Sequence, residues 1–442
     1  MMTANLSNFL QSKEKTAKVI EFLLLAAVFF LPFSKALLEI CITISLIAWF
    51  FKKIKEKESL CHDQSIMLIS GVMIIASSVS AFHSGYPLLS ARGIIKIVKY
   101  VLIMLLVTDV FSSRNALKRL LVVGFIGFSA VVANSYFQYF QFFGRENLVD
   151  PALNIHRLSN SIVRLTGPYS VYGLLAAHLI AVLPVLFSFV ISLKKVRWWA
   201  RLGWWGYFLI SVFLLYKTHS RGALIASFVS WVIYALCSRN RLMLIMLALI
   251  MMVTPFIVPR NVLLHVDRFN QEQSIIERNL LWSRAIQVIQ ARPLFGCGIN
   301  TYIKNYPKFA TKQNWRIFNW SVDVQHHSEL EKQPGWTIPG NDAQLPQYYV
   351  HNGYLQMAAE TGLISLSLFL LILGAALKSG FQAFRSTHDY NRKSMAVGLL
   401  TGFVALLLQA GVDTTLHNIQ SATLIWFFAG ILFAVKCIPE KD

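Results

Sequence analysis

One histidine lies at the start of an apolar stretch, in the sequence YYVHNGYLQMAAETGLIS. An imidazole titrates near neutral pH, so His351 could take a proton from a hydroxyl group as a general base. At about 100° per residue, three small residues fall on its face of a helix and would let a second helix approach: Ala358, Gly362 and Ser365. Glu360 falls on the opposite face, so we expect it to pack or hydrogen-bond elsewhere.

Arginines at several positions could bind the oxygens of a phosphate group. Arg221 lies in the tight connection KTHSRGALIA, next to a glycine that allows close backbone approach. A planar guanidinium binds phosphate through two parallel hydrogen bonds. Arg278 and Arg284 lie at the start of ERNLLWSRAIQVIQARP, and Arg164 lies in another outward loop. Each of these arginines could instead anchor lipid headgroups or face solvent.

Motifs for metal or nucleotide chemistry are absent from the expected positions. The outward loops show neither Asp-x-Asp nor a His and carboxylate spacing suited to a divalent metal, and no glycine-rich phosphate loop occurs. We therefore expect no metal, no cofactor and no ATP-driven pump. The 5 cysteines are too scattered for a disulfide framework, so we expect no bridge.

The elements that must position these residues are membrane helices. Of 442 residues, 55% are hydrophobic and 14% are charged, against about 25% charged in soluble domains. Apolar runs long enough to cross a bilayer recur along the chain. The fold class predicted is an all-α polytopic membrane protein with about twelve transmembrane helices, near 19–33, 36–51, 64–82, 94–111, 119–141, 169–192, 203–217, 222–237, 241–258, 350–377, 394–412 and 421–436.

The basic residues orient these spans. The formal net charge is +20, and most lysines and arginines cluster in connections on one side, which argues against a nucleic-acid partner and places both termini in the cytoplasm. We divide the chain into spans one to nine (1–258), a periplasmic loop domain (259–349) and the last three spans (350–442). Within the loop domain, helical spacing predicts a cap helix on the outer membrane face, ended by Pro293 and two glycines, and its apolar positions are Leu281, Ala285, Val288 and Ile289.

Four motifs occur in a fixed order: TGPYSVYGLLAAHL (166–179), SRGA (220–223), R-x-x-x-W (278–282) running into RPLFGCGINTY, and HNGYLQMAAETGL (351–363). In this order they resemble the bacterial O-antigen ligase and polymerase superfamily, most clearly over residues 160–375. The ligases of that superfamily move a glycan from undecaprenyl diphosphate to a sugar hydroxyl of the lipid A core. They act at the periplasmic face of the inner membrane without a metal and invert the anomeric configuration.

The resemblance also implies roles for particular residues. His351 would be the general base on the acceptor hydroxyl, and Arg221 and Arg278 would bind the diphosphate, whose growing charge needs fixed cations. The partners implied are an undecaprenyl-diphosphate-linked glycan donor, a lipid A-core acceptor and membrane lipids. Supporting roles would fall to Arg164, Arg284, Asn352 and Tyr354.

Two positions depart from the ligase pattern. Ser365 stands where the pattern HN-x9-GxxG has its last glycine, and Tyr349 stands where many relatives have a second histidine, so His351 lacks that partner. The shared motifs fit a polysaccharide polymerase as well as a ligase. A lipid-linked glycan transporter is an alternative from another class, and an assembly subunit is a third. A transporter needs polar groups through the whole membrane depth, whereas Lys96 and Lys99 lie in the outer half, where they could equally reach the headgroups.

Overall fold

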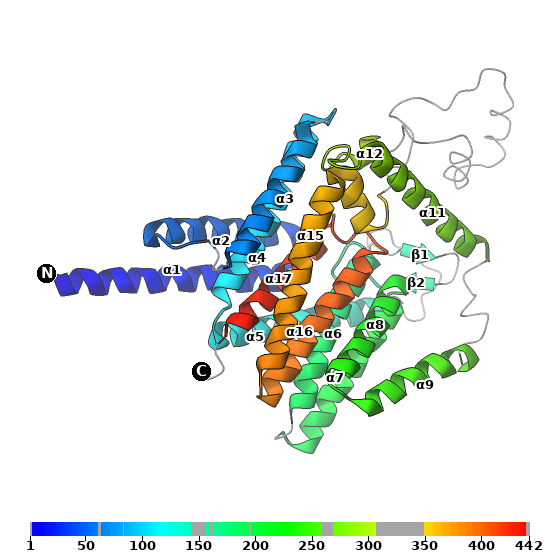
Figure 1. Cartoon of the computed structure of the whole chain (residues 1–442). Coiled ribbons are helices and arrows are strands. Elements are labelled where there is room, and N and C mark those ends of the chain that lie inside the picture. Colours follow the sequence, from blue (N-terminus) through cyan, green and yellow to red (C-terminus); the bar gives the residue numbers. More distant parts are fainter. Residues whose placement is uncertain are drawn as a thin grey trace.

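A computed structural model describes residues 2–60, 63–82, 84–142, 156–158, 162–193, 196–257, 268–305 and 349–438. These residues form helices and one short antiparallel pair of strands, in which His156 lies opposite Arg164 (Figure 1). The elements are α1 (Met2–Phe30), α2 (Lys35–Glu56), α3 (Gln64–Phe82), α4 (Pro87–Val110), α5 (Arg114–Phe142), β1 (His156–Leu158), β2 (Ile162–Arg164), α6 (Tyr172–Ser192), α7 (Trp198–Lys217), α8 (Arg221–Cys237), α9 (Arg241–Ile257), α11 (Arg268–Ala291), α12 (Tyr302–Asn305), α15 (Gly353–Ser386), α16 (Tyr390–Ala410) and α17 (Ile419–Cys437).

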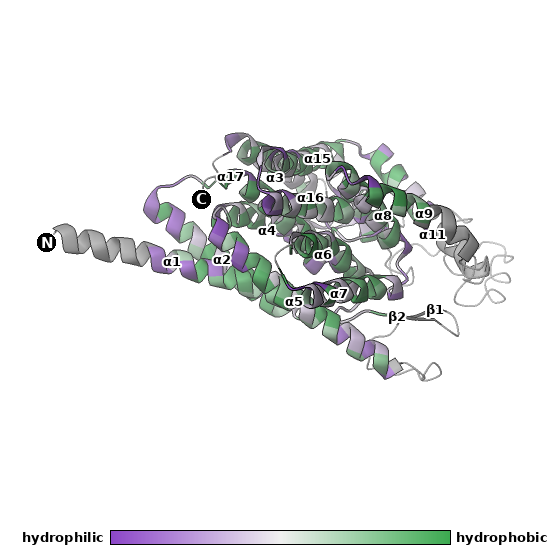
Figure 2. Ribbon diagram, turned by 90° about the horizontal axis from the view of Figure 1, so that it is seen from below, coloured by the Kyte–Doolittle hydropathy of each residue, from purple (hydrophilic) through white to green (hydrophobic). Residues whose placement is uncertain are grey.

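Each of the twelve predicted spans falls on one of these helices. Within the described residues, 6 helices are long and apolar enough to cross a membrane: α3, α5, α6, α15, α16 and α17. Hydrophobic residues cover most of the bundle, and hydrophilic residues gather at several helix ends and connections (Figure 2). The prediction of a helical, multi-pass membrane protein is confirmed.

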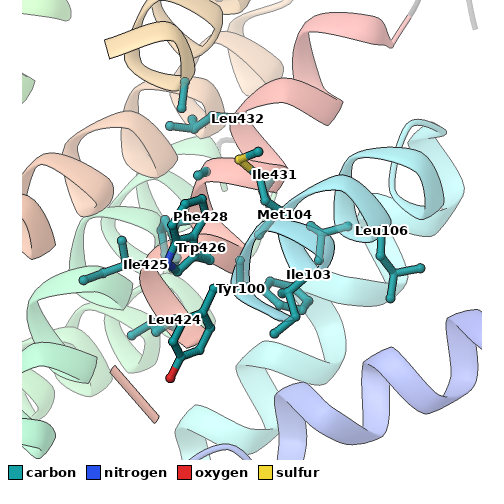
Figure 3. Packing of buried hydrophobic residues seen from close by; sticks show 14 of the residues in the cluster. Tyr100, Ile103, Met104, Leu106, Leu424, Ile425, Trp426, Phe428, Ile431 and Leu432 are labelled. Carbon is teal, nitrogen blue, oxygen red and sulfur yellow. The ribbon is translucent and has the colours of Figure 1, made fainter. Parts of the chain in front are cut away.

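The centre of the bundle is the contact between α4 and α17 (Figure 3). Tyr100 and Met104 of α4 are buried there against aromatic residues of α17 such as Trp426. A methyl group added at Gly430 would lie 2.7 Å from the carbonyl oxygen of Met104, so a larger residue at this position would push the helices apart. Close backbone approach of this kind replaces the hydrophobic effect as the source of packing energy inside a membrane.

Helix α16 packs against α6, α8 and α15, and this arrangement places the starts of α6, α8 and α15 near the end of α16. Gly402 of α16 lies against the backbone of Ala181 in α6, where no side chain would fit. Ser230 of α8 donates to the carbonyl oxygen of Thr401 at 2.7 Å. The strands β1 and β2 lie between the start of α8 and α11 (Figure 1).

Helix α15 is broken at Gly362, whose φ of 79° and ψ of 172° are not helical. Only glycine adopts this conformation readily. The carbonyl oxygens that the break frees are bound by a glycine-rich segment, residues 292–301, that follows α11. The Cys297 N–H donates to Ala359 at 2.9 Å and the Gly298 N–H donates to Glu360 at 3.0 Å. The segment after α11 is thus attached to the broken helix by main-chain hydrogen bonds.

Two local predictions are wrong. His351 does not share a helix face with Ala358, Gly362 and Ser365, because α15 begins at Gly353 and breaks at Gly362. Arg278 does not lie at the start of its helix, because α11 begins at Arg268.

The helix predicted for the cap is present as α11, while the cap itself stays a prediction. Leu281, Ala285 and Val288 of α11 are buried, and the helix ends at Ala291, just before Pro293. Residues 306–348 of the predicted loop domain lie outside the described residues, so the domain boundary at 349 stays a prediction.

Candidate functional site

The imidazole of His351 lies beside a carboxylate that comes from another part of the chain. Its Nδ1 atom is 3.6 Å from Oδ1 of Asp413, which lies in the turn between α16 and α17. Both side chains are partly exposed. The backbone of His351 has a φ of 52°, a left-handed conformation that turns the chain into the start of α15. His351 therefore stands on a bend, facing Asp413, where a substrate can reach it.

The turn that carries Asp413 fits closely among the starts of three helices. A methyl group added at Gly173 of α6 would lie 2.8 Å from Oδ2 of Asp413, and one added at Gly222 of α8 would lie 2.6 Å from Val412. A methyl group at Gly353 of α15 would lie 2.8 Å from Leu416. These glycines let the helix starts converge on residues 411–418, which we call the α16–α17 turn.

Arg221 is the first residue of α8, and its neighbour Gly222 touches the α16–α17 turn. Its side chain is exposed. Ser220 occupies the cap position, but its hydroxyl accepts no hydrogen bond from the first turn of α8. Free backbone N–H groups and a guanidinium at the start of a helix attract anions. Arg221 and His351 thus lie on two sides of the same turn.

Arg164 and Arg278 belong to the same positive region. Burial lowers the pKa of Arg164 from its ordinary value, and the charges of Arg221 and Arg278 lower it further, so Arg164 lies close enough to be repelled by each of the other two. The Arg164 guanidinium lies over the ring of Tyr172, 4.3 Å from the ring centre. An arginine remains charged despite such a shift. A region of repelling cations favours binding of a multiply charged anion.

The other supporting residues have structural positions. Arg284 is 1% exposed, on the packed side of α11. The Asn352 side chain caps α15, accepting from the N–H groups of Tyr354 and Leu355. The Tyr354 hydroxyl donates to the carbonyl oxygen of Leu407 in α16 at 2.8 Å. Asn352 and Tyr354 therefore fix where α15 starts, and with it the position of His351.

Glu360 is buried and connects three parts of the site. Its carboxylate accepts hydrogen bonds from the N–H of Asn300 at 2.8 Å and from the N–H of Tyr302 at 3.3 Å, in the segment after α11. The Gln356 side chain donates to it within α15. On the α16–α17 turn, Nε2 of His417 lies 3.4 Å away. The expectation of a hydrogen-bonding role away from His351 is confirmed.

Lys96 and Lys99 do not share one environment. Lys99 pairs with Glu39 at 2.6 Å. Lys96 lines a cavity of about 90 Å³ with Asn300, Glu360 and His417 among its walls.

Asp413 and His417 are the residues that the motifs did not bring out. They lie four residues apart in VDTTLHN, after the end of α16, and this spacing was a usable signal. The sequence did not assign the two histidine and carboxylate pairs at this turn, His351 with Asp413 and His417 with Glu360. Within the described residues, no group of three or more histidine, cysteine, aspartate or glutamate side chains is placed to hold a metal ion.

The comparisons with known proteins match the same part of the chain. Residues 206–370 match a family model described as O-Antigen ligase. The exopolysaccharide production protein ExoQ of Rhizobium meliloti (strain 1021) is 27% identical over 167 residues, which are 37% of this chain and 32% of the relative. The match thus spans about a third of the relative's length. The resemblance of this chain to the O-antigen ligase superfamily is confirmed over residues 206–370, which contain Arg221, Arg278 and His351.

Proposed function

We propose that this protein is a metal-independent, inverting glycosyltransferase of the O-antigen ligase type. It moves a glycan from undecaprenyl diphosphate to a sugar hydroxyl of the lipid A core at the periplasmic face of the inner membrane. The single observation that carries the proposal is that a possible base and a cation lie at the same turn. The α16–α17 turn has the His351 and Asp413 pair on one side and Arg221 on the other.

His351 acts as the general base in this reaction. Asp413 faces Nδ1 and favours the tautomer with its proton there, which leaves Nε2 to take the proton of the acceptor hydroxyl. The hydroxyl oxygen then forms its bond to the anomeric carbon of the donor sugar from the side opposite the diphosphate. The imidazolium that results is stabilised by the Asp413 carboxylate.

The arginines stabilise the leaving group. As the bond between the anomeric carbon and the diphosphate oxygen breaks, its electron pair goes to the diphosphate. Arg221 and Arg278 bind the added negative charge, and Arg164 assists them, consistent with the repulsion that it feels from each. Arg284 supports α11 from its buried side, because 1% exposure leaves little of it for a ligand.

For the membrane, we propose twelve crossings with both termini in the cytoplasm. The coincidence of each predicted span with a helix and the clustering of basic residues in alternate connections support this path. The segment 259–349 then lies in the periplasm, and α11 and the segment after it belong to a cap over the outward ends of the helices.

A second candidate is a polymerase that transfers one lipid-linked glycan onto another. The name of the relative, an exopolysaccharide production protein, favours it. The chemistry at His351 and the arginines is the same in both reactions, and the acceptor differs.

The test is transfer in vitro with purified protein, a lipid-linked glycan donor and a lipid A-core acceptor. We expect glycosylated core with wild type, with and without EDTA, and none with His351→Ala. Longer donor-linked chains without glycosylated core would assign the polymerase reaction. Absence of any covalent product, under conditions in which a known ligase works, would contradict both and favour transport.

A further inference from the structure

A second pocket lies beside the proposed site. It has a volume of about 620 Å³, and its walls come from the α1–α2 connection, the end of α5, the stretch before α6 and the start of α17. This size is that of a small-molecule binding site. Its lining residues are Phe33, Ser34, Lys35, Asn134, Phe137, Gln138, Gln141, Thr166, Gly167, Pro168, Tyr169, Ser170 and Gln420.

The lining of this pocket, which we call the amide pocket, differs in chemistry from the arginine region. Amide and hydroxyl side chains predominate, and Lys35 is its one charged lining residue. Such groups donate and accept hydrogen bonds without carrying charge. Phe33 and Phe137 are exposed at the pocket and offer apolar ring faces. Neutral hydrogen-bonding groups next to aromatic rings suit a sugar, which has hydroxyl groups on its rim and C–H groups on its faces.

Two buried lining atoms have no hydrogen-bond partner within the described part of the chain. Gln420 is 4% exposed, and its Nε2 donates to the carbonyl oxygen of Leu31 at 2.8 Å, but its Oε1 accepts nothing. The hydroxyl of Tyr169, also 4% exposed, makes no hydrogen bond. A buried polar atom without a partner costs about 1–3 kcal/mol.

The wall of the amide pocket is built before any ligand binds. Gln138 of α5 holds the stretch before α6 in place: its Oε1 accepts from the N–H of Thr166 at 3.2 Å and from the N–H of Gly167 at 2.9 Å. Its Nε2 donates to the Thr166 hydroxyl. This wall is therefore fixed by side-chain hydrogen bonds between α5 and the stretch before α6.

The amide pocket also adjoins the proposed catalytic groups. Thr166 follows Arg164 by two residues, and Gly173, the second residue of α6, lies just after the pocket wall and close to Asp413. At its other side, Gln420 lies three residues beyond His417 of the α16–α17 turn. The pocket wall and the proposed catalytic groups are thus carried by the same two stretches of chain, the one before α6 and the one before α17.

We propose that the amide pocket binds hydroxyl groups of a glycan substrate. The inference rests on the proposed transferase function and names a binding site for the neutral part of its substrates. The glycan is that of the donor or that of the core acceptor, and the two share the same hydroxyl chemistry. Binding energy gained there, away from the reacting atoms, orients the sugar at His351.

Two variants test the pocket at exposed positions. Asn134→Ala removes an amide, and Ser170→Trp fills the space. The matched controls are Asn115→Ala, an exposed asparagine at the other end of α5, and Ser59→Trp, an exposed serine after α2. All four proteins are prepared in nanodiscs and compared with wild type.

Binding is measured directly, by saturation-transfer NMR, with two soluble probes that lack lipid and diphosphate: the free O-antigen repeat oligosaccharide and the delipidated core oligosaccharide. We expect wild type and both controls to bind one of them, and Ser170→Trp to bind neither. The probe that binds identifies the donor or the acceptor glycan. If wild type binds neither probe, or if Ser170→Trp binds as wild type does, the inference is overturned, whatever the transfer assay gives.

Transfer kinetics provide the second measurement. Loss of one neutral hydrogen bond in Asn134→Ala should raise KM for the corresponding substrate about fivefold, with kcat unchanged. An unchanged KM for both substrates would contradict a binding role of this amide. Absence of transfer in wild type would overturn the proposed function, while the NMR result would still decide whether the pocket binds glycan.

Discussion

The Nδ1 atom of His351 lies 3.6 Å from the carboxylate of Asp413, although the two residues belong to different helix connections. This separation is slightly longer than a hydrogen bond, and catalytic hydrogen bonds often shorten when substrate binds. A carboxylate at this position orients the imidazole ring for proton transfer at its other nitrogen.

We expect substitution of this pair to affect the chemical step. His351→Ala should lower kcat by about 10²–10⁴-fold, the usual contribution of a general base. Asp413→Asn should lower kcat less, because it removes the carboxylate that orients the imidazole. The measurement is the rate of transfer at saturating substrate. A kcat for Asp413→Asn that matches wild type would remove Asp413 from the mechanism.

Replacement of the arginines should act on donor binding. Arg221→Lys and Arg278→Lys keep the charge but lose the two parallel hydrogen bonds, so we expect KM for the donor to rise about tenfold. The matched control is Arg241→Lys. Arg241 is the first residue of α9, as Arg221 is the first residue of α8, and it follows the opposite end of α8 from Arg221. Equal effects at Arg221 and Arg241 would contradict a diphosphate site.

Glu360 should act by positioning and not by proton transfer. Glu360→Gln replaces one acceptor oxygen with a donor that faces the N–H groups of Asn300 and Tyr302. We expect lower kcat and higher donor KM with an unchanged acid limb, because His351 and Asp413 are untouched. The control is Glu14→Gln, an exposed residue paired with Lys18. A shift of the acid limb in Glu360→Gln would assign this carboxylate a titrating role instead.

Gly362 should tolerate no side chain. An added Cβ would overlap with the carbonyl group of Leu294, and its backbone angles cost about 1–3 kcal/mol for other residues. Gly362→Ala should therefore lower the thermal unfolding midpoint and transfer activity together. Gly374→Ala, on the same helix with open space around it, should be neutral or slightly stabilising. Equal midpoints for the two variants would show that the break does not need glycine.

His219 should make stability depend on pH. Burial lowers its pKa below the ordinary value, and the charges of Lys217 and Arg164 lower it further. At the same pH, the folded protein then binds fewer protons than the unfolded chain. The contribution of His219 to the free energy of unfolding is therefore most favourable above the ordinary pKa of histidine, and it is lost as the pH falls toward the folded pKa. His219→Asn should flatten the fall of the unfolding midpoint between about pH 7 and pH 5. His388→Asn, at an exposed position, is the control for loss of an imidazole. If the unfolding midpoint of His219→Asn falls with pH as steeply as that of wild type, the prediction is wrong.

The sequence predicted the helices well because hydrophobicity and length are local properties. The span predicted near 64–82 is α3, and the one near 169–192 is α6 to within three residues. The arginine region was also predicted in part, since motifs in a fixed order marked Arg221 and Arg278. Both predictions depend only on the residues within each segment of the sequence.

Two features depend instead on how segments meet. The partner of His351 could not be assigned from spacing, because it requires that α15 and α16 pack with their outward ends together. The break at Gly362 was hidden because MAAETGLISLS reads as continuous helix, and glycine is common in membrane helices. What opens the helix is a set of N–H groups in the segment after α11, far away in the sequence.

That attachment sets an order for assembly. The glycine-rich segment is synthesised before α15, and its Cys297 and Gly298 N–H groups find their partners only when Ala359 and Glu360 have entered the membrane with the new helix. A long-range contact of this kind forms late in folding. The 292–301 segment is therefore joined to α15 only once that helix is inserted. A chain stalled before α15 would leave the 292–301 segment open to protease, so its cleavage would report unfinished insertion.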